Sequence, residues 1–351
     1  MTDSSNSTGG DEPIFDGQDA GGAAQATPVT HEPASAESAA AEQPQKKRKP
    51  RGGTPAPEYR AGFVSFIGRP NVGKSTLTNA LVKEKIAITS DKPQTTRKAI
   101  RGIVHRTDGQ IIVVDTPGIH RPRTLLGERL NALVKSTLGD VDVIGFCVPA
   151  NEKIGPGDRF INEQLDLFPR AKKVAILTKM DVSKPNDAIE QLAELGEMRE
   201  WDAIIPLSAY TGDQINILSD ELVKLMPVSQ QLYPDEAVTD EVKDDRIAEY
   251  IREAALDGVR DELPHSIAVM VEDTIERDDK DMVEIYATIY VERDSQKAII
   301  IGHKGSRLRD VGKVSRAQIE PLVGKKVFLS LHVKVAKDWQ KDPRMLGRLG
   351  F

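Results

Sequence analysis

Short apolar runs alternate with amphipathic stretches from about residue 61 onwards. The runs cover residues 63–67, 111–114, 141–148, 174–177 and 204–207, and helical spacing of apolar residues is seen at 188–195 and 215–226. Buried strands separated by helices indicate a mostly parallel sheet with helices on both faces. We therefore predict an α/β domain over residues 58–230, which Pro227 closes after the last helix.

The remaining chain has a different order of elements. Residues 231–236, with Pro234, predict a linker. The apolar residues that then recur at helical spacing are Ile247, Ile251, Ala254, Ala255 and Val259. Further elements are predicted as strands at 266–272 and 282–292 around a charged turn at 277–281, helices at 295–301 and 306–322, and a strand at 326–335. This α-β-β-α-α-β order predicts an α+β domain over residues 237–351.

Residues 1–57 are rich in Ser, Gly, Ala, Gln, Pro and Glu and hold almost no bulky apolar side chain. Such a segment cannot bury enough surface to offset the entropy of ordering, so we predict a disordered N-terminal tail. The tail ends in a basic cluster between Lys46 and Arg51, which could contact RNA or anionic lipid. A solvated basic linker is the favoured interpretation of this cluster.

Composition excludes several classes of protein. No run of about 18 apolar residues is present, and no apolar segment follows a basic start, so neither a membrane-spanning helix nor a signal peptide is predicted. The single cysteine, Cys147, can form no internal disulfide, which makes a reducing, cytoplasmic location the expectation.

The formal net charge of −6 hides an asymmetry along the chain. Residues 235–296 carry 7 Lys and Arg against 20 Asp and Glu, whereas residues 297–351 carry 13 against 4. A basic segment beside an acidic one suggests a phosphate-binding face. A generic solvated surface is an equally favoured explanation of charge alone.

Residues 68–75 carry the pattern Gly-xxxx-Gly-Lys-Ser between a predicted strand and a predicted helix. Glycines let backbone N–H groups surround a phosphate, and the helix N-terminus adds positive potential. Lys74 is expected to reach the β- and γ-phosphates, and Ser75 to ligate Mg²⁺. The predicted nucleotide contacts of this loop are Gly68, Asn71, Val72, Gly73, Lys74, Ser75 and Thr76.

Further contacts are predicted near the γ-phosphate. Asp115 and Gly118 follow the second predicted strand, where the carboxylate would hold Mg²⁺ through water and the Gly118 N–H would sense the γ-phosphate. Thr95 and Thr96 lie in the polar stretch 89–98, and we prefer Thr96 as the hydroxyl that closes over Mg²⁺. The predicted metal ligands are thus Ser75, Thr96 and Asp115, and the predicted catalytic residues are Lys74, Thr96 and Gly118.

Two later strand ends are suited to recognise a base. Thr178, Lys179 and Asp181 follow the strand at 174–177, and an Asp carboxylate there can accept both N–H groups of guanine, which adenine does not offer in that arrangement. Ser208 and Ala209 follow the next strand, where a backbone N–H could meet the guanine O6. GTP or GDP with Mg²⁺ is therefore predicted rather than ATP.

These elements, in this order, resemble the motifs of the translation-factor-related GTPases over residues 61–226. One departure is Thr178, which stands where the family has Asn and keeps a hydroxyl without the amide. In Ras-like members a Gln that orients the attacking water follows the glycine that corresponds to Gly118, and here that position is Ile119. His120 comes next, and we favour a surface-loop role for it over a role as catalytic base. Asn71 resembles the residue with which related bacterial GTPases bind K⁺, so the resemblance implies K⁺ beside the phosphates. Slow intrinsic turnover, accelerated by a partner, is expected.

Residues 302–305 place a Gly-x-x-Gly turn between two predicted helices. Two glycines permit close approach of a nucleic-acid strand, although this pattern alone favours a plain helix–helix turn. With the element order and the local basic charge it resembles a type II KH domain, whose groove holds about four single-stranded nucleotides. We expect residues 299–301 to pack the floor of that groove. The predicted RNA contacts are Gly302, His303, Lys304, Gly305, Arg307 and Lys313.

A P-loop GTPase followed by a short linker and a type II KH domain is similar to the Era family of bacterial GTPases, as is the run at 338–351. The resemblance covers nearly everything after about residue 58. It implies a GTPase that binds 16S rRNA near its 3′ end and assists biogenesis of the 30S ribosomal subunit. Family members can also associate peripherally with the cytoplasmic membrane, and a monomer is the default.

The leading hypothesis is a switch in which GTP orders residues 89–98 and the stretch after Asp115 and thereby biases RNA binding. The alternative is an RNA-binding assembly protein that uses guanine nucleotide as a structural ligand without productive hydrolysis. A tRNA-modifying GTPase is disfavoured, because the sequence has no cysteine-nucleophile or cofactor motif of a modification domain.

Overall fold

The structure is a computed structural model, and it describes residues 58–90, 92, 95–118, 122, 124–259, 263–277, 279 and 281–351. The predicted tail at 1–57, the residues Ile119 and His120, and part of the predicted turn at 277–281 lie outside the described residues. Within the described part of the chain, no helix is long and apolar enough to cross a membrane.

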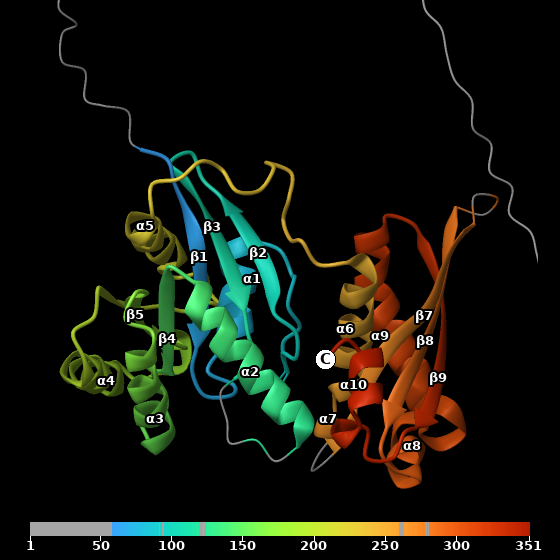
Figure 1. Cartoon of the computed structure of the whole chain (residues 1–351). Coiled ribbons are helices and arrows are strands. Elements are labelled where there is room, and N and C mark those ends of the chain that lie inside the picture. The colour runs from blue at the N-terminus through green and yellow to red at the C-terminus, as the bar shows by residue number, and fades with distance from the viewer. Residues whose placement is uncertain are drawn as a thin grey trace, which may run out of the picture. The chain divides into compact units, whose positions relative to one another are not determined.

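The first half of the described chain forms a six-stranded sheet with the order β2-β3-β1-β4-β5-β6 (Figure 1). Its strands are β1 (Arg60–Ile67), β2 (Ile100–His105), β3 (Gly109–Asp115), β4 (Val143–Pro149), β5 (Lys172–Thr178) and β6 (Ala203–Pro206). β2 is antiparallel to β3 and the other pairs are parallel, so the five predicted strands and the mostly parallel sheet are confirmed. The apolar pattern does not predict the edge strand β2, because Arg101 and Gly102 interrupt its apolar residues.

Helices cover both faces of this sheet. On one face, α1 (Lys74–Val82) and α5 (Ile215–Leu225) pack Leu77, Leu81 and Leu218 against the strands. The helices on the other face are α2 (Leu125–Asp140), α3 (Pro156–Gln164) and α4 (Pro185–Met198). The carboxyl ends of the parallel strands, where ligands bind in open α/β sheets, are therefore left to loops.

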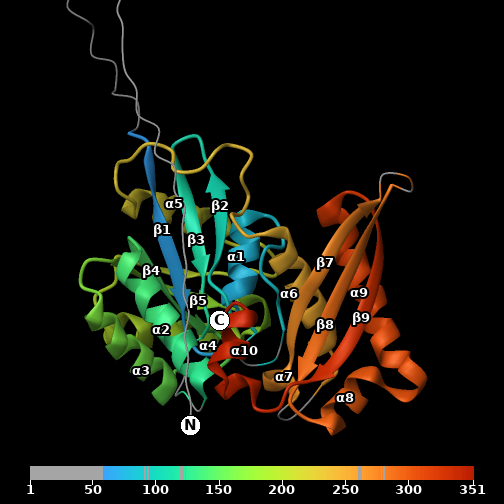
Figure 2. The same cartoon turned by 45° about the vertical axis from the view of Figure 1, so that its right-hand side comes forward.

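The second half of the described chain builds a three-stranded sheet with the order β7-β8-β9. Its elements are α6 (Lys243–Leu256), α7 (Leu263–Ser266), β7 (Ala268–Arg277), β8 (Met282–Val291), α8 (Asp294–Ile301), α9 (Ser306–Val323), β9 (Lys326–Val335) and α10 (Pro343–Arg348). β7 and β8 are antiparallel, and β8 and β9 are parallel (Figure 2). One apolar core joins α6, α8 and α9 to this sheet. The α-β-β-α-α-β order is confirmed; the short helices α7 and α10 are additions that the apolar pattern does not predict.

The segment predicted as a linker is held against the first sheet by one buried side chain. The Gln110 side-chain amide donates to the Tyr233 carbonyl oxygen and accepts from the N–H groups of Leu232 and Tyr233, each over 2.9 Å. Further along, the Ile103 N–H donates to the Val238 carbonyl oxygen at 2.9 Å. Residues 232–238 are therefore hydrogen-bonded to β2 and β3 at both ends of this segment.

Candidate functional site

The loop between β1 and α1 requires glycine at its first position. A Cβ atom on Gly68 would lie 2.5 Å from the Cys147 carbonyl oxygen and 2.9 Å from a methyl group of Val72. At the end of the loop Gly73 has a φ of 97°, in the left-handed region that favours glycine, and caps the N-terminus of α1. Gly68 and Gly73 thus allow the loop to turn tightly in front of the backbone N–H groups at the start of α1.

Lys74 begins α1, and its ammonium group is buried beneath this loop. The Nζ atom donates to the carbonyl oxygens of Gly68, at 3.1 Å, and Arg69, at 2.9 Å. Burial lowers the pKa of Lys74, and the nearby Asp115 carboxylate opposes the shift. A buried cation with neutral partners next to a ring of N–H groups is suited to an anionic phosphate.

The three predicted metal ligands come together from three separate segments. The hydroxyls of Ser75 and Thr96 donate to Asp115 Oδ2 at 2.8 and 3.1 Å and lie 3.0 Å apart. Asp115 is fully buried, and its Oδ1 atom has no hydrogen-bond partner among the described residues. Burial raises the pKa of Asp115, while the hydrogen bond from Ser75 and the charge of Lys74 oppose it. An oxygen-only donor set with one unused carboxylate oxygen fits Mg²⁺.

A single carboxylate is typical of magnesium sites that share the ion with substrate phosphates. Among the described residues, no group of three His, Cys, Asp or Glu side chains could hold a metal ion. The residues present therefore suit an ion that draws its remaining ligands from nucleotide oxygens and water.

A cavity of about 440 Å³ opens in front of this cluster. The predicted contacts that line it are Asn71, Gly73, Lys74, Ser75, Thr76, Thr96, Gly118 and Lys179. It is also lined by Pro70, Ile88, Thr89, Ser90, Lys92 and Thr95. Most of these additional residues belong to the polar stretch at 89–98. From the sequence, only Thr96 of this stretch is predicted at the site, although the polar pattern extends over its neighbours.

The base-recognition residues lie at the ends of β5 and β6. The buried Thr178 hydroxyl donates to the Val72 carbonyl oxygen at 2.7 Å, with the Val148 carbonyl at 3.2 Å. The Ser208 hydroxyl donates to Asp181 Oδ1 at 2.6 Å, and Asp181 is otherwise exposed. Thr178 and Ser208 thus support the loop and the carboxylate, respectively, and Val72 packs its side chain in the core.

The Gly-x-x-Gly turn joins α8 to α9 with both glycines at positive φ. Gly302 has a φ of 73°, and a Cβ atom there would lie 2.7 Å from Arg307 Cβ. Gly305 has a φ of 75°, and nothing lies within 4 Å of its Cβ position. His303 and Lys304 are exposed between them. The turn therefore offers an open backbone at Gly305 and a close-packed one at Gly302.

A groove of about 260 Å³ runs from this turn between α9 and β9. It is lined by Gly305, Leu308, Arg309, Gly312, Arg316, Leu329 and Leu331. The expectation that residues 299–301 form its floor is wrong, because Ile300 is buried in the core and Ile299 is half exposed. Leu308, Leu329 and Leu331 take that place, since the turn of α9 and the pleat of β9 point them there.

Two of the predicted RNA contacts differ in their surroundings. Lys313 is exposed on α9. The Arg307 guanidinium instead donates to the carbonyl oxygens of Ala255 and Asp257 at the end of α6. In the sequence both are basic residues of one predicted helix, and only the packing distinguishes them.

Comparison with known proteins agrees with this geometry. Residues 63–179 match the family described as "50S ribosome-binding GTPase", and residues 262–340 match the family described as "KH domain". The phosphate loop, the oxygen cluster and the Gly-x-x-Gly groove define the class as a P-loop GTPase with a KH domain. The fold class predicted from the sequence is confirmed.

The relatives specify the family. The chain is 70% identical over 295 residues to GTPase Era of Leifsonia xyli subsp. xyli (84% of this chain, 99% of that protein) and 59% identical over 309 residues to GTPase Era of Nocardioides sp. (86% and 99%). A solved structure of Era in complex with MgGDPNP and nucleotides 1506–1542 of 16S ribosomal RNA is 34% identical, with a TM-score of 0.80, over 83% of this chain and 99% of that one. The chain belongs to the Era family of GTPases, so the predicted resemblance is confirmed.

Proposed function

We propose that this protein binds GTP with Mg²⁺, hydrolyses it to GDP and phosphate, and binds 16S rRNA near its 3′ end. The observation that carries the proposal is the meeting of Ser75, Thr96 and Asp115 beside the buried Lys74. A solved relative holds MgGDPNP and a 16S rRNA segment in one complex. We assign the GTPase part to residues 58–230, the linker to 231–236 and the KH part to 237–351.

The proposed roles follow from the geometry. Loop N–H groups and Lys74 stabilise the charge that develops on the transferred phosphoryl group. Ser75, Thr96 and Asp115 would hold a magnesium ion, directly or through water, and the ion would supply positive charge to the phosphate oxygens when bound. Gly118 lies beside Lys74, with its Cβ position 3.5 Å from Nζ, where its N–H can meet the γ-phosphate.

Base selection is assigned to Asp181, which Ser208 orients, with Lys179 and Ala209 alongside. The carboxylate accepts two N–H groups of guanine, and an adenine ring leaves it unpaired, which costs about 1–3 kcal/mol or more for a charged group. Ile119 cannot polarise water, so intrinsic hydrolysis is expected to be slow.

Single-turnover hydrolysis of GTP by the purified chain tests this function. Lys74→Ala is expected to abolish hydrolysis and weaken GTP binding, because the loop loses the cation that faces the phosphates. Lys135→Ala, an exposed lysine on α2, is the matched control and should behave like the wild type. A wild-type chain that binds GTP without hydrolysing it would favour the alternative, an assembly protein with a structural nucleotide.

A potassium ion is proposed at Asn71. This residue lines the cavity in the loop and has a φ of 63°. A monovalent cation there would add positive charge next to the phosphates, in the way an arginine finger does elsewhere. Replacing KCl by NaCl should slow hydrolysis in the wild type and have no effect on Asn71→Ala. Equal rates in both salts for the wild type would remove K⁺ from the proposal.

RNA binding is assigned to the groove beside Gly305. Its apolar floor suits unstacked bases, and the basic residues along the turn and α9 suit the phosphates. Lys304→Glu and Lys313→Glu should each weaken binding of a 16S 3′-end oligonucleotide and reduce the salt slope by about 1. Lys341→Glu, on an exposed lysine paired with Asp338, is the control. Unchanged affinity in the first two variants would move the RNA site elsewhere.

The same proposal includes a role in 30S subunit biogenesis for a cytoplasmic monomer, with peripheral contact to the membrane. Depletion of the protein should accumulate immature 30S particles, and light scattering should give the mass of one 38.5 kDa chain. Cell fractionation at low and high salt tests the membrane contact, since a peripheral protein is released by salt.

A further inference from the structure

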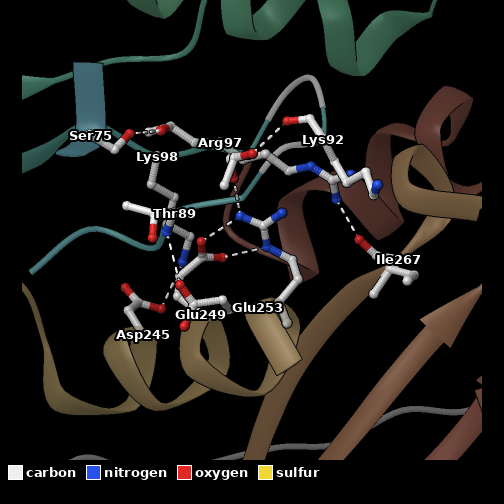
Figure 3. A network of polar contacts seen from close by, with 12 residues as sticks. Ser75, Thr89, Lys92, Arg97, Lys98, Asp245, Glu249, Glu253 and Ile267 are labelled. Atoms are coloured by element: carbon white, nitrogen blue, oxygen red, sulfur yellow. Dashed lines mark hydrogen bonds and ion pairs between the residues drawn. The ribbon is translucent and has the colours of Figure 1, made fainter. Parts of the chain in front are cut away.

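The stretch that carries Thr96 is anchored in the second half of the chain through its neighbour, Arg97 (Figure 3). Arg97 is 2% exposed. Its guanidinium donates to the carbonyl oxygens of Ile267 at 2.6 Å, His265 at 2.8 Å and Pro264 at 3.3 Å. Pro264 and His265 belong to α7, and Ile267 lies between α7 and β7. The guanidinium carbon of Arg97 lies over the indole ring of Trp339, 5.7 Å from the ring centroid.

Residues on both sides of Thr96 are also held by α6. Arg252 on that helix donates to the Thr95 carbonyl oxygen and pairs with Glu249 on the same helix. Lys98 pairs with Asp245 at 2.7 Å. Thr96 therefore places its hydroxyl at the oxygen cluster, while the Thr95 carbonyl and the Arg97 and Lys98 side chains are held by the second half of the chain.

The burial of Arg97 is costly by itself. Its partners are neutral carbonyl groups and an aromatic ring, and its Nε atom has no hydrogen-bond partner among the described residues. A buried guanidinium without a paired carboxylate is unfavourable compared with an apolar side chain of similar size. Stability alone therefore does not account for an arginine at this position, whereas a fixed neighbour for Thr96 does.

We propose that Arg97 is a positioning residue for GTP hydrolysis, whose anchorage to residues 264–267 holds the Thr96 hydroxyl at the magnesium site. The proposal rests on the proposed function and deepens it, because it makes the KH part a support of the nucleotide site. Linkage requires the reverse as well: a nucleotide that engages Thr96 stabilises the anchorage.

Arg97→Met and Arg97→Lys test this role in the full-length chain. We expect Arg97→Met to slow single-turnover hydrolysis by about 10- to 100-fold, because small displacements of a catalytic group cost rates of this order. The Mg²⁺ concentration needed for half-maximal rate should rise and GDPNP affinity should fall, while GDP affinity stays unchanged. Arg97→Lys keeps the positive charge, but an ammonium group cannot reproduce the guanidinium's hydrogen bonds to three carbonyl oxygens. Its hydrolysis rate should lie between those of Arg97→Met and the wild type.

The matched control is Arg101→Met. Arg101 lies four residues further on, is half exposed and pairs with Asp240 at 2.9 Å. It should leave hydrolysis and the GDPNP affinity as in the wild type. An equal defect in this variant would show a general loss of contact to the second half and overturn the specific role of Arg97.

A double-mutant cycle with Thr96→Val distinguishes positioning from structure. If Arg97 acts through Thr96, adding Arg97→Met to Thr96→Val has no further effect on rate or Mg²⁺ requirement. Additive effects, or an equal fall in GDP and GDPNP affinity, would overturn the proposal. Should Arg97→Met fail to fold, Arg97→Lys carries the same cycle. A wild type without hydrolysis would contradict the proposed function, yet the GDPNP-to-GDP affinity ratio would still test Arg97.

Discussion

The Thr178 hydroxyl donates a hydrogen bond of 2.7 Å to the Val72 carbonyl oxygen. The bond joins the end of β5 to the phosphate loop across 106 positions of sequence. Thr178 stands where the broader GTPase class has Asn, and in this chain its hydroxyl supports the loop without an amide. A hydroxyl at this position thus keeps the loop in place, and in the proposed function recognition of the base is assigned to Asp181.

Removing this hydroxyl should weaken all guanine nucleotides alike. Thr178→Val leaves the Val72 carbonyl buried without its donor, which costs about 1–3 kcal/mol. We expect GTP and GDP affinities to fall together by about tenfold or more, measured by titration calorimetry, while Thr178→Ser stays close to wild type. A GTP-only loss would mean that Thr178 senses the γ-phosphate instead.

The two glycines of the turn between α8 and α9 should tolerate alanine differently. Gly305→Ala should cost about 1–2 kcal/mol of unfolding free energy, because only the left-handed backbone is strained. Gly302→Ala should cost about 1–3 kcal/mol more, since its Cβ atom would meet Arg307 at 2.7 Å. Urea unfolding of both variants measures the difference; equal losses would contradict the close packing at Gly302.

Trp339 should carry an unusual share of stability for a residue near the end of the chain. It is fully buried, its indole N–H donates to the Ser266 carbonyl oxygen at 3.0 Å, and it packs with Leu126 and Leu130 of α2 in one apolar cluster. Trp339→Ala is expected to lower the unfolding free energy by about 3–5 kcal/mol. Trp201→Phe, which keeps an aromatic ring against Phe146, is the control, and a loss of similar size there would argue against a special role for Trp339.

Glu241 should make stability depend on pH. Burial, together with the carboxylates of Glu249 and Asp245, raises its pKa to about 8, against the opposing charges of Arg246 and Lys98. Neither carboxylate oxygen has a hydrogen-bond partner among the described residues. Because the folded chain binds this proton more tightly than the unfolded chain, the stability it contributes is complete below about pH 4.5 and lost as pH rises through about 8.

The difference between wild type and Glu241→Gln isolates this effect. The unfolding free energy of the wild type should fall relative to the variant by up to about 1.4 kcal/mol per pH unit over this range, and level off above it. Glu236→Gln, on an exposed carboxylate nearby, should run parallel to wild type. If the unfolding free energies of Glu241→Gln and the wild type also change in parallel with pH, the Glu241 carboxylate is solvated and the prediction is wrong.

Much of the nucleotide site could be predicted because its parts are local in sequence. The loop from Gly68 to Ser75 contains its own glycines and begins its own helix, and the other contacts sit at strand ends, which parallel strands bring to one edge. The edge strand β2 escaped prediction because burial on a sheet edge leaves no clear apolar period. The role of Arg307 could not be predicted either. A basic residue on a helix looks the same in the sequence whether it faces RNA or donates to the carbonyl oxygens at the end of a neighbouring helix.

A few neighbouring residues encode each part of the candidate chemistry: the phosphate loop, the oxygen ligands, the carboxylate proposed to select guanine, and the Gly-x-x-Gly turn. The contacts that support these parts depend on the tertiary structure. Arg97 meets the Ile267 carbonyl across 170 positions of sequence, and the groove beside Gly305 takes its floor from a different strand. Such contacts depend on how separate elements pack, and packing is a property of the folded chain that no local pattern of residues records.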